Sequence, residues 1–160
     1  MTLNDEYAIR AIEYLVYEWA RAVDEDRLED LAKLLTDDAE YKVASRYNLD
    51  RGLPHALIHC KSAAQLRDRL LSARVANVYE RHHYRHLVTG VQVIGQSQDT
   101  FEVRANFSVI RTMEHDGSMA LFAVGQYRDS IIFVSDAPRF KRREVVIDSK
   151  AIDTLMVLPL

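Results

Sequence analysis

In the first half of the chain, apolar and polar residues follow one another with the period of an α-helix. One set of apolar residues recurs at spacings of three and four, which places its members on one helix face: Ile9, Ile12, Val16, Trp19, Ala20 and Val23. A shorter stripe follows at residues 28–35, where the spacing of Asp26 and Glu29 predicts a capping box. A third helix is predicted to begin at Ser62, with three leucines facing inward: Leu66, Leu70 and Leu71.

In the second half the period changes to two, which is typical of a strand with one buried face. Four apolar residues alternate with polar ones in this way: Val103, Ala105, Phe107 and Val109. Asp116 and Gly117 predict a hairpin turn, and Gly125 predicts a bulge or bend in the strand that follows. The expected strands are residues 41–43, 87–94, 101–109, 119–134 and 140–148, and a loop is expected at 48–54.

This order of elements, helices first and then an antiparallel meander, predicts an α+β fold. The helices are expected to pack on one face of a curved, mostly antiparallel sheet. A chain of 160 residues suits one domain, residues 1–160, and no internal repeat or linker interrupts the pattern. Seven basic residues on the strands are expected to lie mainly on the solvated face of the sheet: Arg104, Arg111, Arg128, Arg139, Lys141, Arg142 and Arg143.

Charge and cysteine content narrow the range of functions. The formal net charge of −3 gives no electrostatic reason to expect nucleic acid or an anionic membrane as a partner. The first residues lack the basic and apolar regions of a signal peptide, and the apolar runs are too short to span a bilayer, so we expect a cytoplasmic protein. The single cysteine, Cys60, excludes an internal disulfide and a cysteine-rich metal site, and we expect an inert free thiol.

The most unusual stretch is Glu80-Arg81-His82-His83-Tyr84-Arg85-His86. On a helix, His82 and His86 would share a face and offer two metal ligands. The segment runs directly into the strand predicted at 87–94, however, and on a strand His83 and His86 point to opposite faces. Besides a polar entrance to the sheet, it fits a docking surface, because Arg and Tyr are favoured at protein interfaces. The candidate contact residues are Arg81, Tyr84, Arg85 and His86.

Acid–base catalysis is a second possibility for the polar residues. A cone made from helices and a curved sheet often holds a pocket at its open end, and Asp and His in such a pocket can move protons. The candidates for its lining are Asp24, Tyr41, His83, His86 and Asp148. No sequence spacing distinguishes them from ordinary polar residues at strand ends.

The last residues, 154–160, are so apolar that we expect their side chains to be buried. A tail of this composition is either tucked into the core of its own domain or buried against a partner, and the pattern leaves both open. If a partner covers it, the contact residues are Leu155, Met156, Leu158 and Leu160.

Four segments spread over the chain resemble one known family. Residues 79–93, YERHHYRHLVTGVQV, are similar to the stretch before the first meander strand in the small (β) subunits of aromatic-ring-hydroxylating dioxygenases. Residues 103–112, 121–129 and 140–148 are similar to later segments of the same subunits, and the helical half fits in order and spacing. The resemblance covers essentially the whole chain.

The resemblance implies the cone-like fold shared with nuclear transport factor two and scytalone dehydratase. It implies a structural, non-catalytic subunit of an α3β3 oxygenase with a β trimer as its stem. The Rieske [2Fe–2S] cluster and mononuclear iron would lie in the large (α) subunit, because a Rieske centre needs two Cys and two His ligands. Residues 77–81 and 153–160 look most like subunits of systems acting on aromatic carboxylates such as anthranilate, salicylate or terephthalate. The alternative is a free-standing dehydratase or isomerase of the same fold that uses a pocket Asp–His pair.

Overall fold

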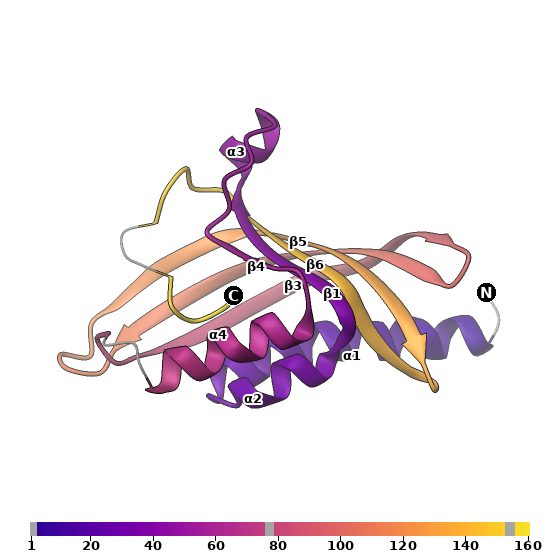
Figure 1. Ribbon diagram of the computed structural model, residues 1–160, viewed down its shortest axis with the longest axis horizontal. Coiled ribbons are helices and arrows are strands. Elements are labelled where there is room, and N and C mark those ends of the chain that lie inside the picture. The colour runs from indigo at the N-terminus through magenta and orange to yellow at the C-terminus, as the bar shows by residue number, and fades with distance from the viewer. Residues whose placement is uncertain (1–2, 76–78, 153–155) are drawn as a thin grey trace.

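The computed structural model describes residues 3–75, 79–152 and 156–160. Within these ranges the helices come first and the long strands follow (Figure 1). The elements are α1 (Leu3–Asp24), α2 (Leu28–Leu31), a short 3-10 turn (Ala32–Leu34), β1 (Leu35–Ser45), α3 (Arg46–Asp50), β2 (Ile58–Cys60), α4 (Ala63–Val75), β3 (His82–Ser97), β4 (Thr100–Met113), β5 (Met119–Val134) and β6 (Ala137–Ile147). None of the described helices is long and apolar enough to cross a membrane.

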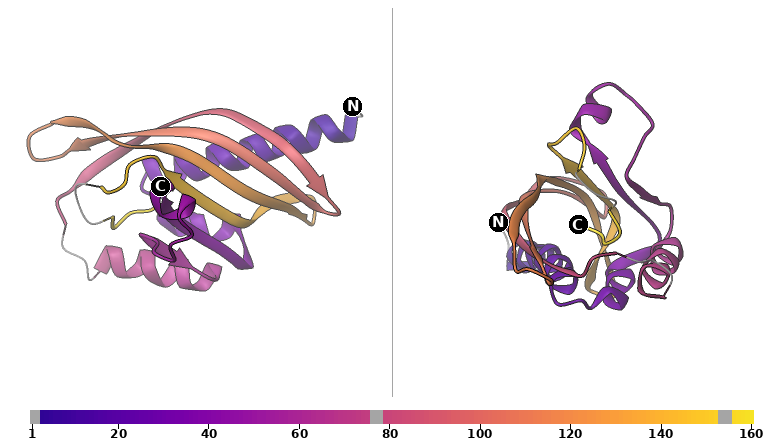
Figure 2. Two further views of the ribbon diagram at one scale, coloured as in Figure 1. Left: turned by 90° about the horizontal axis from the view of Figure 1, so that it is seen from above. Right: turned by 90° about the vertical axis from the view of Figure 1, so that its left-hand side faces the viewer.

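The strands of the described chain form one six-stranded sheet in the order β2-β1-β6-β5-β4-β3. β1 runs parallel to β6, and the other neighbouring pairs are antiparallel. The sheet curls around, and α1, α2 and α4 lie together on one side of it (Figures 1 and 2). The expected α+β fold, with helices on one face of a curved and mostly antiparallel sheet, is confirmed.

The core lies between α1 and the concave face of the sheet. Ile12, Val16 and Trp19 are fully buried, as their helical spacing predicted. The ring of Trp19 lies 5.2 Å from that of Tyr41 on β1 and 5.7 Å from that of Phe140 on β6, measured between ring centroids. The first helix is therefore held by aromatic contacts to two neighbouring strands.

The predicted meander strands are also present, and they alternate as expected. Val103, Ala105, Phe107 and Val109 all face the core from β4. Gly125 lies on β5, but the reason for a glycine there is close packing of two strands and not the expected bulge or bend. A Cβ atom at this position would lie 1.9 Å from the backbone oxygen of Val146, so β5 and β6 approach too closely for any side chain.

The second predicted helical stretch ends one residue early. α2 and the 3-10 turn together cover residues 28–34, and Leu35 already begins β1 by pairing with Phe140. The capping box is absent as well, because Glu29 accepts hydrogen bonds from Arg74 and no side chain caps α2. Pairing with β6 outweighs the local helical pattern here.

Two further boundaries differ from the sequence predictions. β1 extends over Leu35–Ser45 rather than 41–43, and the predicted loop at 48–54 begins inside α3, where the Ser45 hydroxyl accepts a hydrogen bond from the Asn48 N–H. β3 begins at His82, because the polar residues before Leu87 pair with β4. His82 and His86 therefore lie on a strand, and the helical metal arrangement is wrong. His83 is exposed and His86 is buried, so they do face opposite sides.

Candidate functional site

A buried carboxylate–imidazole pair joins the end of α1 to β3. The Nδ1 atom of His86 lies 2.6 Å from Oδ1 of Asp24, and the backbone N–H of His86 donates to Oδ2 of Asp24 at 2.9 Å. The His86 side chain is fully shielded and that of Asp24 is 7% exposed. Among the described residues, none bonds to Nε2 of His86. Asp24 thus fixes the orientation of the His86 ring, as a carboxylate does in many acid–base sites.

A cleft of about 490 Å³ opens beside this pair, between the ends of α1 and α4 and the start of β3. Asp24, His82 and Tyr84 line it, with Arg81 at its rim, but the ring of His86 is not part of its lining. Arg74 also borders the cleft, and its guanidinium already donates to Asp26 and Glu29. The cleft therefore reaches the carboxylate of the pair and not the second nitrogen of the imidazole.

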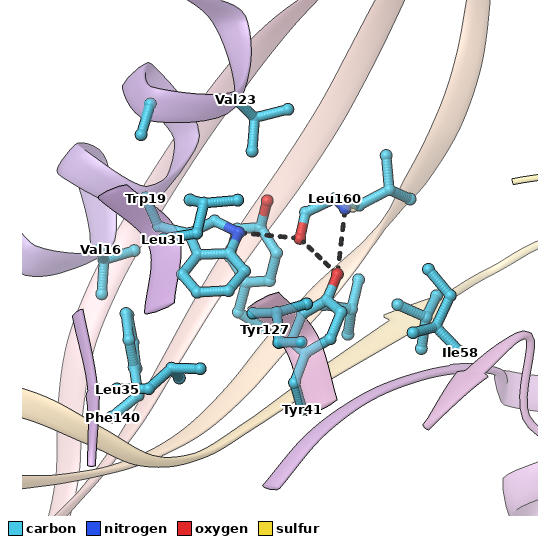
Figure 3. Close-up of a cluster of buried hydrophobic side chains, with 14 of the residues drawn as sticks. Val16, Trp19, Val23, Leu31, Leu35, Tyr41, Ile58, Tyr127, Phe140 and Leu160 are labelled. Carbon is cyan, nitrogen blue, oxygen red and sulfur yellow. Dashed lines mark hydrogen bonds between the residues drawn. The ribbon is translucent and has the colours of Figure 1, made fainter. Parts of the chain in front are cut away.

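The interior of the cone is filled by the last residues of the chain. The indole N–H of Trp19 donates to the backbone oxygen of Leu160 at 3.0 Å (Figure 3). The Tyr41 hydroxyl donates to the same oxygen and accepts from the Leu160 N–H, each at 3.1 Å. Burial raises the pKa of Tyr41 above its usual value. Tyr41 is thus engaged by the tail and does not line the cleft.

A second buried pair, Asp129 and Arg143, was not anticipated from the sequence. The two residues are cross-strand partners on β5 and β6, and Nη1 of Arg143 donates to Oδ2 of Asp129 at 2.8 Å. Both side chains are 0% exposed. Burial raises the pKa of Asp129 to about 7. Arg143 was expected among the solvated basic residues. It turns inward because an irregularity in the β5–β6 register shifts the alternation before it.

Arg143 lies among aromatic rings as well as beside a carboxylate. Its guanidinium carbon is 3.8 Å from the centre of the Tyr127 ring and 4.6 Å from that of Phe140. Burial also raises the pKa of Tyr127 to about 12. The aromatic faces and the single carboxylate together compensate a cation that is removed from water.

The five predicted pocket residues do not form one pocket. Asp24 and His86 meet as a buried pair, although they are 62 positions apart. Tyr41 is in the core, whereas His83 is exposed, 3.7 Å from Glu114, and lines the same cleft as Asp24. Asp148 is exposed as well and pairs with Arg46. The prediction of a common pocket is therefore wrong for Tyr41 and Asp148, which lie away from the cleft.

The predicted contact residues of the polar stretch fall into two groups. Arg81 and Arg85 are exposed and accessible to a partner. Tyr84 is buried, with its ring stacked 5.2 Å from that of Phe122, and His86 is held by Asp24. Tyr84 and His86 are thus packed within this chain, and their assignment to an interface stays a prediction.

The apolar tail is covered by its own domain. Met156, Leu158 and Leu160 are 3%, 7% and 0% exposed, whereas Leu155 lies outside the described residues. Arg69 of α4 donates to the backbone oxygen of Met156 at 3.0 Å and helps to hold the tail. Of the two possibilities that the sequence left open, burial in the core accounts for these apolar side chains without a partner.

The described residues offer no set of metal ligands. No three His, Cys, Asp or Glu side chains in these ranges lie close enough together to hold an ion. Cys60 is buried on β2, and burial raises the pKa of its thiol. With a single cysteine, the chain does not fit the two-Cys, two-His ligand set of a Rieske cluster.

Comparison with known proteins agrees with this geometry. Residues 5–144 match the model of the SnoaL-like domain family, which defines the class of fold. The cone-like fold of the scytalone dehydratase type, expected from the sequence resemblance, is thereby confirmed.

Three relatives define the family more narrowly. The chain is 33% identical over 138 residues to the anthranilate 1,2-dioxygenase small subunit from Burkholderia cepacia, covering 86% of this chain and 85% of the relative. It is 38% identical over 144 residues to subunit beta 2 of the terminal oxygenase component of terephthalate 1,2-dioxygenase from Comamonas sp., covering 89% and 92%. A crystal structure described as the β subunit of an aromatic-ring-hydroxylating dioxygenase from Novosphingobium aromaticivorans superposes with a TM-score of 0.87 at 30% identity, covering 96% and 97%. The chain belongs to the small (β) subunits of aromatic-ring-hydroxylating dioxygenases and is thus part of an oxidoreductase.

Proposed function

We propose that this chain is a structural, non-catalytic small subunit of a cytoplasmic terminal oxygenase that acts on an aromatic carboxylate. It binds a large (α) subunit that carries the Rieske [2Fe–2S] cluster and the mononuclear iron. The assembly is α3β3, with a trimer of this chain as its stem. Arg81 and Arg85, which are exposed at the start of β3, are the contact residues carried over from the sequence.

The filled cone is the observation that carries the structural role. Leu160 lies between Trp19 and Tyr41, so the tail of the chain itself occupies this part of the interior. The side chains around it are buried and apolar (Figure 3). The choice of an aromatic carboxylate is supported by the relatives, because anthranilate and terephthalate are both aromatic acids.

A free-standing dehydratase or isomerase is the second candidate, and the Asp24–His86 pair favours it. The pair has the geometry of a general base and the residue that orients it. Two hollows border the pair. The cleft described above is lined by Asp24 and not by His86, and a second one, of about 570 Å³, is lined by both residues but leaves the His86 side chain fully shielded. Because a substrate would not reach the His86 ring, the Asp24–His86 pair fits the attachment of α1 to β3 better than it fits catalysis.

The test compares the mass of the chain by light scattering, alone at low concentration and after co-expression with its large subunit. A trimer that joins a complex of six chains is the expected result. A chain that stays free while the large subunit is present contradicts the proposal.

Two variants separate the candidates further. Asp24→Asn and His86→Gln are expected to leave the turnover of the assembled oxygenase unchanged while lowering the melting temperature of the chain. If instead the isolated chain dehydrates or isomerises a small substrate, and both variants lose this activity while they remain folded, the second candidate is correct.

A further inference from the structure

The face of α1 opposite the core carries an unusual set of side chains. Apolar residues cover its inner face, as in any amphipathic helix, but the outer face is not made of small or charged residues alone. It carries a stripe of five residues at alternating spacings of three and four, which we name the tyrosine–arginine stripe: Tyr7, Arg10, Tyr14, Tyr17 and Arg21. This spacing is that of the seam of a coiled coil.

The stripe is open to solvent along its whole length. Tyr7, Tyr14 and Tyr17 are 63%, 69% and 43% exposed, and the Arg10 side chain is 75% exposed. The N-terminal part of α1 extends away from α2 and α4, so these helices do not cover it (Figure 1). Tyrosine and arginine are the residue types that contribute most at protein interfaces, and three exposed tyrosines on one helix face are uncommon on a surface that only meets water.

The stripes of two copies of the chain are complementary to each other when the two α1 helices run in opposite directions. If two α1 helices cross antiparallel with a two-fold axis at Tyr14, Tyr7 of one copy lies opposite Arg21 of the other. Arg10 then lies within one residue of the level of Tyr17, and the two Tyr14 rings meet at the axis. Every arginine faces a tyrosine, which is the arrangement required for cation–π contacts, and no arginine faces another. A parallel pairing would place each arginine against its own copy and would be repulsive.

We propose that the tyrosine–arginine stripe is a docking surface for a second copy of this chain, joined through antiparallel α1 helices about a two-fold axis at Tyr14. The contact is isologous, because each copy contributes the same five residues. It is separate from the three-fold contact of the proposed stem, since a two-fold axis cannot close a trimer. It therefore does not depend on the function proposed above.

Disulfide trapping tests the axis directly. In the full-length chain, Tyr14→Cys is expected to form an intermolecular disulfide under mild oxidation at least tenfold faster than Tyr7→Cys. The two copies of position 7 in an antiparallel pair are separated by about 21 Å of helix, which no disulfide spans. An equimolar mixture of Tyr7→Cys and Arg21→Cys is expected to give mixed dimers. The wild-type chain, whose Cys60 is buried, sets the background.

Matched variants test the role of the arginines. Adding Arg10→Glu and Arg21→Glu to Tyr14→Cys is expected to slow crosslinking at least tenfold. Adding Arg51→Glu is expected to leave the rate unchanged, because Arg51 lies over its own Tyr47 on α3 and outside the stripe. Leu71 was expected to face inward but is exposed on α4, so Leu71→Cys serves as the control for random collision. Equal crosslinking rates for the single-cysteine substitutions at positions 7, 14 and 71 would overturn the proposal.

Binding of the large subunit separates this inference from the proposed function. The arginine variants are expected to assemble with the large subunit as the wild-type chain does. If they lose that assembly while Tyr14→Cys crosslinks no faster than Leu71→Cys, the stripe is a large-subunit surface and pairing between copies is wrong. If the wild-type chain ignores the large subunit but Tyr14→Cys still crosslinks selectively, the proposed function fails and the pairing stands.

Discussion

The indole N–H of Trp19 donates a hydrogen bond to the backbone oxygen of Leu160, 3.0 Å away, across 141 positions of sequence. This bond ties the long first helix to the final residues of the chain. Together with the two bonds between Tyr41 and Leu160, it closes the interior of the cone. The end of the tail is thereby fixed between the first helix and β1.

Removal of the Tyr41 hydroxyl tests how much this closure contributes to stability. Tyr41→Phe is expected to lower the free energy of unfolding by about 1–3 kcal/mol, because it leaves the buried Leu160 N–H without its acceptor. Urea denaturation followed by tryptophan fluorescence measures the change, since the single Trp19 lies next to the site. Tyr79→Phe, at an exposed position outside the tyrosine–arginine stripe, is the matched control. Equal losses for the two variants would show that the tail contact contributes little.

Gly125 is expected to tolerate no side chain. Gly125→Ala places a Cβ atom against the backbone oxygen of Val146, which cannot move without separating β5 from β6. We expect a loss of about 1–3 kcal/mol or more in the free energy of unfolding. Gly95→Ala is the control, because no atom lies within 4 Å of the Cβ position there. A Gly125→Ala variant as stable as Gly95→Ala would contradict the close approach of the two strands.

The titration of Asp129 predicts a pH dependence with a definite sign. Burial raises its pKa from 3.8 to about 7, so between these values the folded chain holds a proton that the unfolded chain has lost. The contribution of Asp129 to stability is therefore full below about pH 4 and is lost as the pH rises toward 7. The wild-type chain should lose its advantage over Asp129→Asn by at most about 1.4 kcal/mol per pH unit in this window.

Urea denaturation of both chains at pH 5, 6, 7 and 8 measures this difference. It is expected to fall up to pH 7 and to stay constant above it. A difference that grows with pH would mean that the attraction of Arg143, 2.8 Å away, outweighs the burial of the carboxylate. The pKa of Asp129 would then lie below its ordinary value.

Cys60 is expected to react slowly with thiol reagents in the folded chain. It is 5% exposed, and burial raises the pKa of its thiol, so both access and the thiolate fraction are low. The rate of reaction with a colorimetric disulfide reagent should rise by orders of magnitude in urea. A fast reaction without denaturant would show that β2, which carries Cys60, opens readily.

Elements that depend on neighbouring residues could be predicted from the sequence, whereas elements that depend on pairing with a distant strand could not. The face of α1 that carries Ile12, Val16 and Trp19 and the alternation along β4 were predicted correctly, because helical and strand periods act between near neighbours. The start of β1 was not, because Leu35 pairs with Phe140 on a strand more than a hundred positions later. The extension of β3 back to His82 has the same cause, since its partner is Met113 of β4.

The sequence by itself determined the class of fold, the inner face of α1, the alternating strands and the family, because periodicity and local similarity depend on neighbouring residues. Only the tertiary structure decided that Asp24 meets His86, that Arg143 turns inward to Asp129, and that the tail ends between Trp19 and Tyr41. These contacts join residues far apart in the chain, and a register irregularity of a single position decides which side chain faces inward. No local pattern carries that information, because it arises only when the strands pair.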